Sequence, residues 1–319
     1  MRSLVTGGAG LIGSHLTERL LAQGDEVTVL DDLSTGRWEN LRAVADCPRL
    51  RAVQGSIFDG ALLRELATGC DQVFHLAAAV GVQMIVERPV QTIETNVAGT
   101  EQVLRMALER RLPVLITSSS EVYGKSADVP FREDGDMVFG PTTVTRWSYA
   151  CSKAIDEFLA LAYAREYGLP VVVARLFNTV GSRQIGRYGM VIPRLVQQCR
   201  DGGPMVVHGD GAQTRCFAAA EDVAAILVRL LALPEAHGRI FNVGHDEEHS
   251  ILDLAERVRR RIDPGCAIRR IPYDEAYGPG FEDLRRRVPD LSRLRALLGP
   301  LPMRGLDEIL DGVIAAAPD

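Results

Sequence analysis

Residues 6–13 read TGGAGLIG, a glycine-rich stretch that separates a short apolar run from a helical pattern at residues 11–24. Gly7, Gly10 and Gly13 recur at every third position. A strand followed by such a turn can bend sharply, bring backbone N–H groups close to a pyrophosphate, and let the next helix pack tightly on a sheet. Glycine triads are common in turns, but the strand before this one and the amphipathic helix after it predict a dinucleotide-binding turn.

A second apolar run, residues 26–30, ends in Asp31 and Asp32, at about the 20-residue spacing expected after such a turn. The Asp31 carboxylate would accept hydrogen bonds from the adenosine ribose and repel a 2′-phosphate, which favours NAD over NADP. Two alternatives stay open. Asp31 could simply begin a turn, and the nearby Arg37 keeps NADP possible.

The first 175 residues alternate between short apolar runs and longer helical patterns. The expected strands are residues 3–6, 26–30, 50–54, 72–76, 113–117 and 170–175. The expected helices are residues 11–24, 60–69, 87–111 and 147–168. Apolar strands that alternate with helices predict an α/β fold with a Rossmann-type, doubly wound parallel sheet covered on both faces.

After residue 176 the sequence becomes richer in Gly and Pro, its elements shorten, and one more strand pattern appears at residues 240–244. We therefore expect two domains, a dinucleotide-binding domain at 1–175 and a smaller mixed α/β lobe at 176–319. Some strands and helices of the lobe should pack back on the first domain.

The 319 residues are 46% hydrophobic and 24% charged, a globular rather than a disordered composition. A formal net charge of −6 gives a nucleic-acid partner no electrostatic support. No apolar run approaches the ~18 residues that a membrane helix needs, and the first residues do not read as a secretion signal. Six scattered cysteines without a CxxC pair argue against a metal site or disulfides. We expect a soluble, cytoplasmic protein without metal, nucleic-acid or membrane partners.

Tyr149 and Lys153 lie four residues apart in the helical pattern at 147–168, so both side chains share one helix face. A lysine held near the phenol would favour phenolate and lower the pKa of Tyr149. Such a tyrosine is a competent base for taking a hydroxyl proton while hydride leaves the same carbon.

These motifs resemble the extended short-chain dehydrogenase/reductase family, specifically its nucleotide-sugar epimerases, dehydratases and decarboxylases. The motifs that carry the resemblance are TGGAGLIG (6–13), HLAA (75–78), TNVAGT (95–100), SSSEVYG (118–124), YACSK (149–153), ARLFN (174–178), VHGDGAQTR (207–215) and RRVPDL (286–291). The resemblance implies NAD as cofactor, a UDP-sugar substrate held by the second lobe, and a homodimer formed through the helices at 88–110 and 147–167. One departure is Ser56, where the family often has an aspartate that contacts adenine.

The resemblance also implies site residues, position by position. The cofactor residues would be Gly7, Gly10, Leu11, Ile12, Gly13, Asp31, Asp32, Ser34, Thr35, Gly36, Ser56, Ile57, Leu76, Ala77, Ala78, Asn96, Tyr149 and Lys153. The substrate residues would be Val80, Arg88, Glu121, Asn178, Arg187, Val191, Val207, His208, Arg215 and Arg287. The catalytic residues would be Ser119, Ser120, Glu121, Arg146, Tyr149, Lys153 and Arg287. Ser119 would bind the sugar C4 hydroxyl, Asn178 the sugar or its diphosphate, and Arg215 and Arg287 would lie near the diphosphate.

Glu121 separates the reactions that this family performs after the C4 hydroxyl is oxidised. A 4-epimerase needs no acid there, and its relatives usually have a small hydroxyl residue. A 4,6-dehydratase has an Asp-Glu pair, of which the first member is Ser120 here. A hexuronate decarboxylase forms a β-keto acid that loses CO₂, and needs a carboxylate and a cation near C5 and C6.

Glu121, Arg146 three residues before Tyr149, and Arg287 in an R-x-P-D motif resemble UDP-glucuronate decarboxylases and UDP-apiose/xylose synthases. We therefore predict decarboxylation of UDP-glucuronate to UDP-xylose or a UDP-4-ketopentose. A 4-epimerase of a UDP-hexose or UDP-hexuronate is the alternative, and a 4,6-dehydratase a lesser one. A dinucleotide-binding sensor would normally lack the tyrosine or the lysine. Glu121 could also be a buried acid with a purely structural role.

Overall fold

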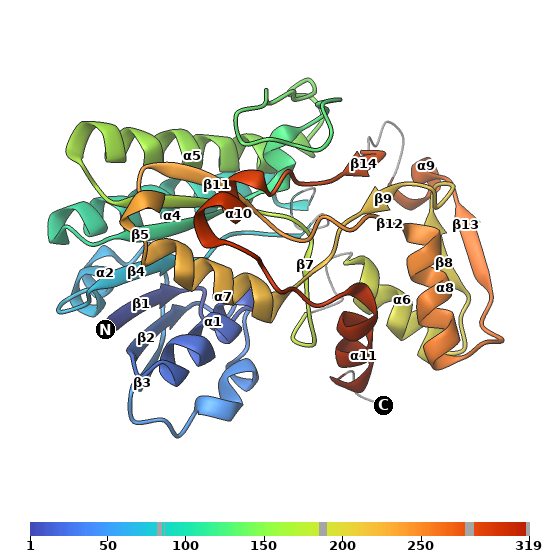
Figure 1. Ribbon diagram of the computed structural model, residues 1–319, viewed down its shortest axis with the longest axis horizontal. Coiled ribbons are helices and arrows are strands. Elements are labelled where there is room, and N and C mark those ends of the chain that lie inside the picture. The colour runs from blue at the N-terminus through green and yellow to red at the C-terminus, as the bar shows by residue number, and fades with distance from the viewer. Residues whose placement is uncertain (82–84, 86, 185–189, 278–283, 317–319) are drawn as a thin grey trace.

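The computed structural model describes residues 1–81, 85, 87–184, 190–277 and 284–316. In these residues seven parallel strands form one large sheet, in the order β11-β6-β5-β4-β1-β2-β3 (Figure 1). Its strands are β1 (Arg2–Thr6), β2 (Glu26–Asp31), β3 (Leu50–Gln54), β4 (Gln72–His75), β5 (Val114–Ser119), β6 (Val171–Leu176) and β11 (Arg239–Val243). The six strands predicted before residue 176 are all present, and no bound moves by more than two residues. The α/β doubly wound fold is confirmed.

Helices cover both faces of this sheet because alternate residues of each strand point to opposite sides. Leu4 and Val73 belong to one apolar core, with α2, α4 and α5. Their neighbours Val5 and Phe74 belong to the other core, with α1, α7 and α10. The helices of the two layers are α1 (Leu11–Ala22), α2 (Gly60–Leu66), α4 (Pro89–Arg110), α5 (Trp147–Tyr167), α7 (Ala220–Leu231) and α10 (Ser292–Leu298).

A second group of elements lies beyond the carboxyl ends of the large-sheet strands (Figure 1). Its helices are α6 (Val191–Arg200), α8 (Ile251–Ile262), α9 (Tyr273–Tyr277) and α11 (Leu306–Ala316). Its strands are β8 (Met205–His208), β9 (Thr214–Arg215), β12 (His249–Ser250), β13 (Ile268–Ile271) and β14 (Arg286–Arg287). The short strands β7 (Thr179–Val180) and β10 (Ala218–Ala219) pair with each other at the junction, and the 3₁₀ turns are η1 (Trp38–Val44), η2 (Ser120–Tyr123) and η4 (Pro234–Ala236).

The strand predicted at 240–244 is present as β11, and it pairs in parallel with β6 at the edge of the large sheet. Two helices from the second half of the chain, α7 and α10, also pack on this sheet. Elements from the second half of the chain thus pack on the large sheet. The boundary between residues 175 and 176 stays a prediction.

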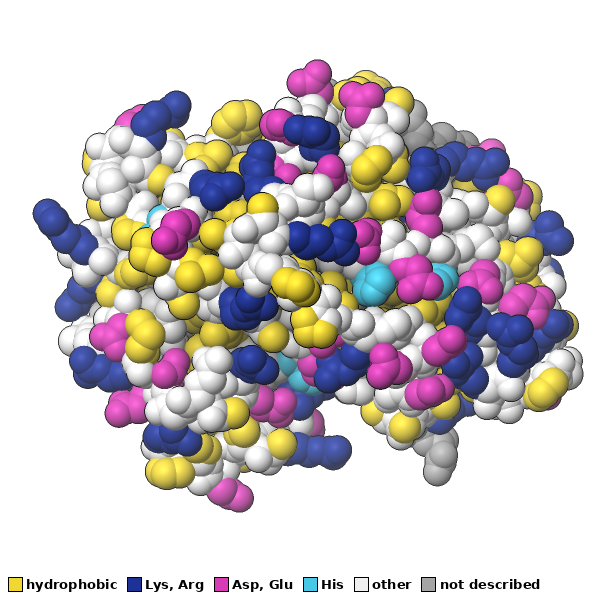
Figure 2. All heavy atoms as spheres, viewed as in Figure 1, with side chains coloured by type: hydrophobic (Ala, Val, Ile, Leu, Met, Phe, Trp, Pro, Cys, Tyr) yellow, Lys and Arg dark blue, Asp and Glu magenta, His cyan; other side chains and the backbone are white. Residues whose placement is uncertain are grey.

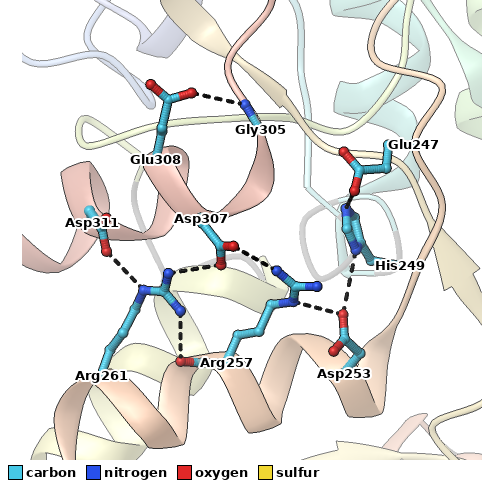
Figure 3. Close-up of polar contacts among 9 residues, drawn as sticks. All are labelled: Glu247, His249, Asp253, Arg257, Arg261, Gly305, Asp307, Glu308 and Asp311. Carbon is cyan, nitrogen blue, oxygen red and sulfur yellow. Dashed lines mark hydrogen bonds and ion pairs between the residues drawn. The ribbon is translucent and has the colours of Figure 1, made fainter.

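The last helix, α11, is attached to α8 by apolar contacts and by a row of ion pairs (Figure 3). Arg257 donates to Asp307 at 2.9 Å, and Arg261 donates to Asp307 and Asp311 at 2.8 Å each. The carboxylates of these pairs are largely exposed, so each pair is worth less than about 1 kcal/mol. Burial of the apolar side of α11, including Leu310, therefore supplies most of the attachment.

On the face drawn in Figure 2, Lys and Arg side chains are interspersed with Asp and Glu rather than gathered in one basic field. Among the described residues, none of the helices combines the length and the apolar character that crossing a lipid bilayer requires.

Candidate active site

A cavity of about 800 Å³ opens at the carboxyl ends of the large-sheet strands and extends toward the second group of elements. Ligands of doubly wound sheets bind at this edge, because the loops that follow the strands converge there. The predicted cofactor residues that line the cavity are Gly7, Gly10, Leu11, Ile12, Gly13, Asp31, Asp32, Ser34, Thr35, Ser56, Ile57, Leu76, Ala77, Ala78, Tyr149 and Lys153. The other predicted residues that line it are Val80, Ser119, Ser120, Glu121, Arg146, Asn178, Val191, His208, Arg215 and Arg287.

Four predicted residues do not line the cavity. Arg88 is an exposed residue at the start of α4. Val207 is buried in the apolar core of the second group of elements, and alternation along β8 points His208 toward the cavity instead. Gly36 lies against Asp31, and Asn96 is buried behind the loop after β4. Of the described residues that were predicted for the site, these four are therefore not part of the cavity wall. Arg187 lies outside the described residues.

Asn96 supports the cavity wall from behind. Its Oδ1 accepts from the Ala79 N–H at 2.9 Å, and its Nδ2 donates to Ser152 Oγ at 3.0 Å. The loop after β4 is thereby tied to α5, the helix that carries Tyr149 and Lys153. The role of Asn96 is to position the loop.

The glycine-rich turn has the geometry that a pyrophosphate needs. Gly7 has a φ of +72°, and a Cβ there would come within 2.6 Å of the Ala77 nitrogen. A Cβ on Gly13 would come within 2.2 Å of the Gly7 carbonyl oxygen, so α1 can pack this closely only with glycine. Helix α1 begins directly after the turn, and no side chain caps its first N–H groups. These N–H groups and the helix dipole form a cradle for an anionic phosphate group.

Asp31 lies at the end of β2 and shapes the adjacent loop. Its carboxylate accepts from the Ala9 N–H and the Leu33 N–H, each at 2.9 Å. Burial raises the pKa of Asp31, and these two hydrogen bonds oppose the rise. A Cβ on Gly36 would come within 2.8 Å of Asp31 Oδ1, so Gly36 leaves this carboxylate its space. Asp31 is therefore held at the cavity wall, where a ribose hydroxyl can donate to it.

Tyr149 lies on the face of α5 that borders the cavity, one helical turn before Lys153. Burial raises the pKa of the Tyr149 phenol, while the Lys153 charge and hydrogen bonding with Ser119 oppose the rise. The prediction of a lowered pKa is therefore wrong in its net direction, because the cost of burying phenolate outweighs the attraction of the nearby ammonium.

Lys153 has a close partner that the sequence analysis missed. Its Nζ lies 2.9 Å from Asp156 Oδ2, and both side chains are buried. Burial disfavours the ammonium, but Asp156 and Tyr149 outweigh this effect and the pKa of Lys153 is raised. The i, i+3 spacing of Lys153 and Asp156 on one helix face was the available signal.

Glu121 lies in η2, directly after β5, and two arginines contact its carboxylate. Ser119 caps η2, because its Oγ accepts a hydrogen bond from the Glu121 N–H at 3.2 Å. This bond fixes the backbone position from which the Glu121 side chain extends. Arg287 Nη1 lies 2.7 Å from Glu121 Oε1, and Arg146 Nη2 lies 3.5 Å from Oε2. Arg287 comes from β14 and Arg146 from the residue before α5. Two cations and one anion leave this cluster with a formal charge of +1 beside the tyrosine.

The far end of the cavity is also basic. Arg215 donates to the Leu284 carbonyl at 2.8 Å, and Asn178 Nδ2 donates to the Cys216 carbonyl at 2.9 Å. Arg194 on α6 was not predicted, yet it lines the cavity and its Nη1 lies 3.0 Å from His208 Nε2. Arginines gathered at one end of a pocket suit an anionic diphosphate.

The family model described as "NAD dependent epimerase/dehydratase family" matches residues 3–244. The chain belongs to this family. The resemblance stated from the motifs is thus confirmed, and NAD is the cofactor. The glycine cradle and Asp31 fit its pyrophosphate and ribose.

Curated relatives cover most of the chain. A UDP-N-acetyl-alpha-D-glucosaminuronate decarboxylase of Bacillus cytotoxicus is 39% identical over 93% of this chain and 91% of its own length. UDP-glucuronic acid decarboxylase 1 of Arabidopsis thaliana is 36% identical over 99% of this chain and 69% of its own length.

Solved structures show the same fold. A UDP-glucuronic acid 4-epimerase from Bacillus cereus, in complex with UDP-glucuronic acid and NAD, has a TM-score of 0.88 at 27% identity, over 99% of this chain and 98% of the other. A dTDP-glucose 4,6-dehydratase from Streptomyces venezuelae with NAD bound has a TM-score of 0.88 at 31% identity, over 99% of this chain and 96% of the other.

Proposed function

We propose that this enzyme oxidises C4 of UDP-glucuronate with NAD and then decarboxylates it, giving UDP-xylose or a UDP-4-ketopentose. The observation that carries the proposal is the Glu121 cluster. Arg146, Arg287 and Glu121 place a formal charge of +1 beside Tyr149, inside the cavity that the glycine turn opens. A hexuronate brings a carboxylate that this charge would attract, whereas a neutral hexose has no group that needs it.

The first step, oxidation at C4, uses residues beside the cluster. Tyr149 takes the proton of the C4 hydroxyl, and Ser119 hydrogen-bonds the same oxygen. NAD⁺, which the glycine turn and Asp31 would hold, would supply the hydride acceptor for C4. The resulting 4-keto sugar is a β-keto acid, so the C5–C6 bond breaks and its electrons move onto the C4 oxygen as CO₂ leaves.

The enolate that remains needs a proton at C5 and positive charge near O4. Lys153 and the arginines supply the field, and Glu121, an anion in the resting cluster, takes up a proton from solvent and delivers it to C5. Release at this stage gives the 4-ketopentose. For UDP-xylose, Tyr149 returns its proton to O4, and the reduced cofactor would supply the hydride to C4.

Recognition of the nucleotide falls to the basic end of the cavity. We assign the diphosphate to Arg215, Asn178 and Arg194, since all three line the cavity. The Bacillus cytotoxicus relative is named for a UDP-N-acetylglucosaminuronate. Both sugars carry the C6 carboxylate on which the proposed reaction depends.

The test is to incubate the purified protein with NAD⁺ and UDP-glucuronate, and in parallel with UDP-N-acetylglucosaminuronate, and to follow the products by mass. Loss of CO₂ from either substrate supports the proposal. An isomer of unchanged mass, separable as the galacturonate form, would instead establish the 4-epimerase. That alternative is favoured by the fold shared with the Bacillus cereus 4-epimerase.

We also propose that the protein is a cytoplasmic homodimer. Helices α4 and α5 lie side by side and expose Val90 (66%), Ile93 (41%), Ile155 (48%) and Phe158 (70%). Pairing these helices with a second copy would bury the apolar side chains in a four-helix bundle. Sedimentation should give twice the chain mass, and Phe158→Asp should shift it to one chain mass. The scattered cysteines suit a reducing compartment.

A further inference from the structure

A buried carboxylate lies against the lysine of the Tyr149–Lys153 pair. Asp156 Oδ2 is 2.9 Å from Lys153 Nζ, and the Asp156 side chain has no solvent exposure. We propose that Asp156 is a positioning residue that holds the Lys153 ammonium charged and in place beside Tyr149, and thereby sets the pH range in which Tyr149 exchanges its proton. This rests on the proposed C4 oxidation, a step that the decarboxylase, the epimerase and the dehydratase share.

The first part of the argument is steric. Lys153 has a long, flexible side chain that could adopt many rotamers, and it must present its ammonium to the ribose and the phenol. A contact to Asp156 one turn further along α5 selects one of these rotamers. Both residues belong to one helix, whose backbone already fixes the positions of their Cβ atoms. The ion pair therefore holds Lys153 in this rotamer at little further cost in conformational entropy.

The second part is electrostatic. A buried ammonium tends to lose its proton unless an anion compensates it. Asp156 supplies this anion while Tyr149 is still a neutral phenol. The same negative charge opposes formation of phenolate. Tyr149 and Lys153 titrate as a coupled pair, so loss of the Asp156 charge must lower the first pKa of the pair, whichever of the two releases the proton.

Other ionisable groups near Lys153 are committed elsewhere. Glu157, the next residue on α5, forms its ion pair with Arg175 at 2.7 Å. From β4, His75 lies between Thr6 and Thr100, and burial lowers its pKa to about 3, so it stays neutral.

From η2, Glu121 is paired with Arg287 and Arg146. Among the described residues, Asp156 is thus the carboxylate in direct contact with Lys153, and the Glu121 charge also acts on the Tyr149 phenol.

The experiment compares the NAD-loaded wild type with Asp156→Asn, Asp156→Glu and Glu166→Gln. The asparagine keeps the shape of the side chain and removes its charge. The glutamate keeps the charge but moves it. Glu166→Gln removes an exposed charge from the same helix and is the matched control. The first readout is the rate of sugar-nucleotide turnover across the pH range.

In Asp156→Asn the acidic limb of the pH–rate profile should lie about one pH unit lower, because one buried negative charge beside the Tyr149–Lys153 pair has been removed. Asp156→Glu should return the limb to the wild-type position with a lower kcat, and Glu166→Gln should leave it unchanged. A wild-type limb in Asp156→Asn would overturn the proposal. If Asp156→Asn does not fold, an unchanged kcat in Asp156→Glu overturns it instead.

A second readout needs no substrate. Tyrosinate absorbance is titrated in the wild type and in Asp156→Asn, each with and without Tyr149→Phe, so that the difference isolates the phenol. Tyrosinate absorbance reports the proton lost by Tyr149, and a parallel measurement of released protons includes the one lost by Lys153. The first proton of this pair should be lost at lower pH in Asp156→Asn than in the wild type. This result is independent of the sugar nucleotide, so failure of the proposed reaction and failure of the role of Asp156 are distinguishable.

Discussion

Arg287 of β14 donates to Glu121 of η2 across 2.7 Å, and this contact joins the second group of elements to the end of the fifth strand of the large sheet. The two residues are far apart in sequence, and each comes from a short element, η2 of four residues and β14 of two. The ion pair therefore assembles the proposed acid and its cation only when both parts of the fold are in place.

Glu121→Gln should lower decarboxylation by at least about 100-fold, because the amide cannot deliver a proton to C5. NAD affinity should stay at the wild-type value, since Glu121 follows β5 and is not part of the glycine turn after β1. Product formation followed by mass and NAD binding followed by fluorescence check the two statements. Full 4-epimerisation of a UDP-hexuronate in this variant would contradict the proposed role.

Arg287→Gln should also lower decarboxylation by about 100-fold, because it removes the cation that lies closest to Glu121. The neighbouring Arg286→Gln is the control, because Arg286 is more than half exposed and pairs with Glu248 at 2.7 Å. It should change the rate by less than about twofold and leave the free energy of unfolding at the wild-type value. Equal losses in both variants would show that β14 acts through its backbone.

Arg175→Lys should lower the free energy of unfolding by about 2–4 kcal/mol. The Arg175 guanidinium is buried, donates to both Glu157 oxygens at 2.7–3.2 Å, and lies over the Tyr123 ring. Lysine cannot reproduce this planar, two-pronged contact. Arg132→Lys, at an exposed pair, should leave the free energy of unfolding close to the wild-type value. Urea unfolding of both variants measures the difference.

His75 should make the protein less stable in mild acid. Burial lowers its pKa from 6.5 to about 3, so between these two values the unfolded chain binds a proton that the folded chain does not. The free energy of unfolding should therefore fall by roughly 1 kcal/mol for each pH unit below 6.5 from this group alone. His75→Asn should remove this part of the pH dependence. Parallel unfolding curves for wild type and variant as the pH falls would refute it.

Much of the sheet and of the cofactor site was predictable, because both depend on local signals. The glycines of residues 6–13 and the alternation of apolar strands with helices each report on their own neighbourhood. The Glu121 cluster was predictable only as a set of residue types. The pairing of β14 with β9 decides which arginine lies closer to Glu121. This pairing joins segments far apart in the sequence, so no local sequence pattern predicts it.

The pKa of Tyr149 shows a different limit. Its spacing from Lys153 predicted the favourable charge interaction, which the structure contains. The cost of burial depends on everything that packs around the phenol, and it reversed the net direction. Asp156 was missed because the Tyr149–Lys153 spacing was interpreted without the next turn of the same helix.

The return of β11, α7 and α10 to the large sheet has a consequence for biosynthesis. A ribosome that has released the first 176 residues has made every strand through β6, but β6 is then an uncovered edge, and the face that α7 and α10 cover is open to water. Such an intermediate exposes apolar surface and unpaired backbone groups to aggregation. The dinucleotide-binding half is therefore complete only after synthesis has passed residue 298. Until then, chaperones would have to shield the exposed apolar surface of the nascent chain.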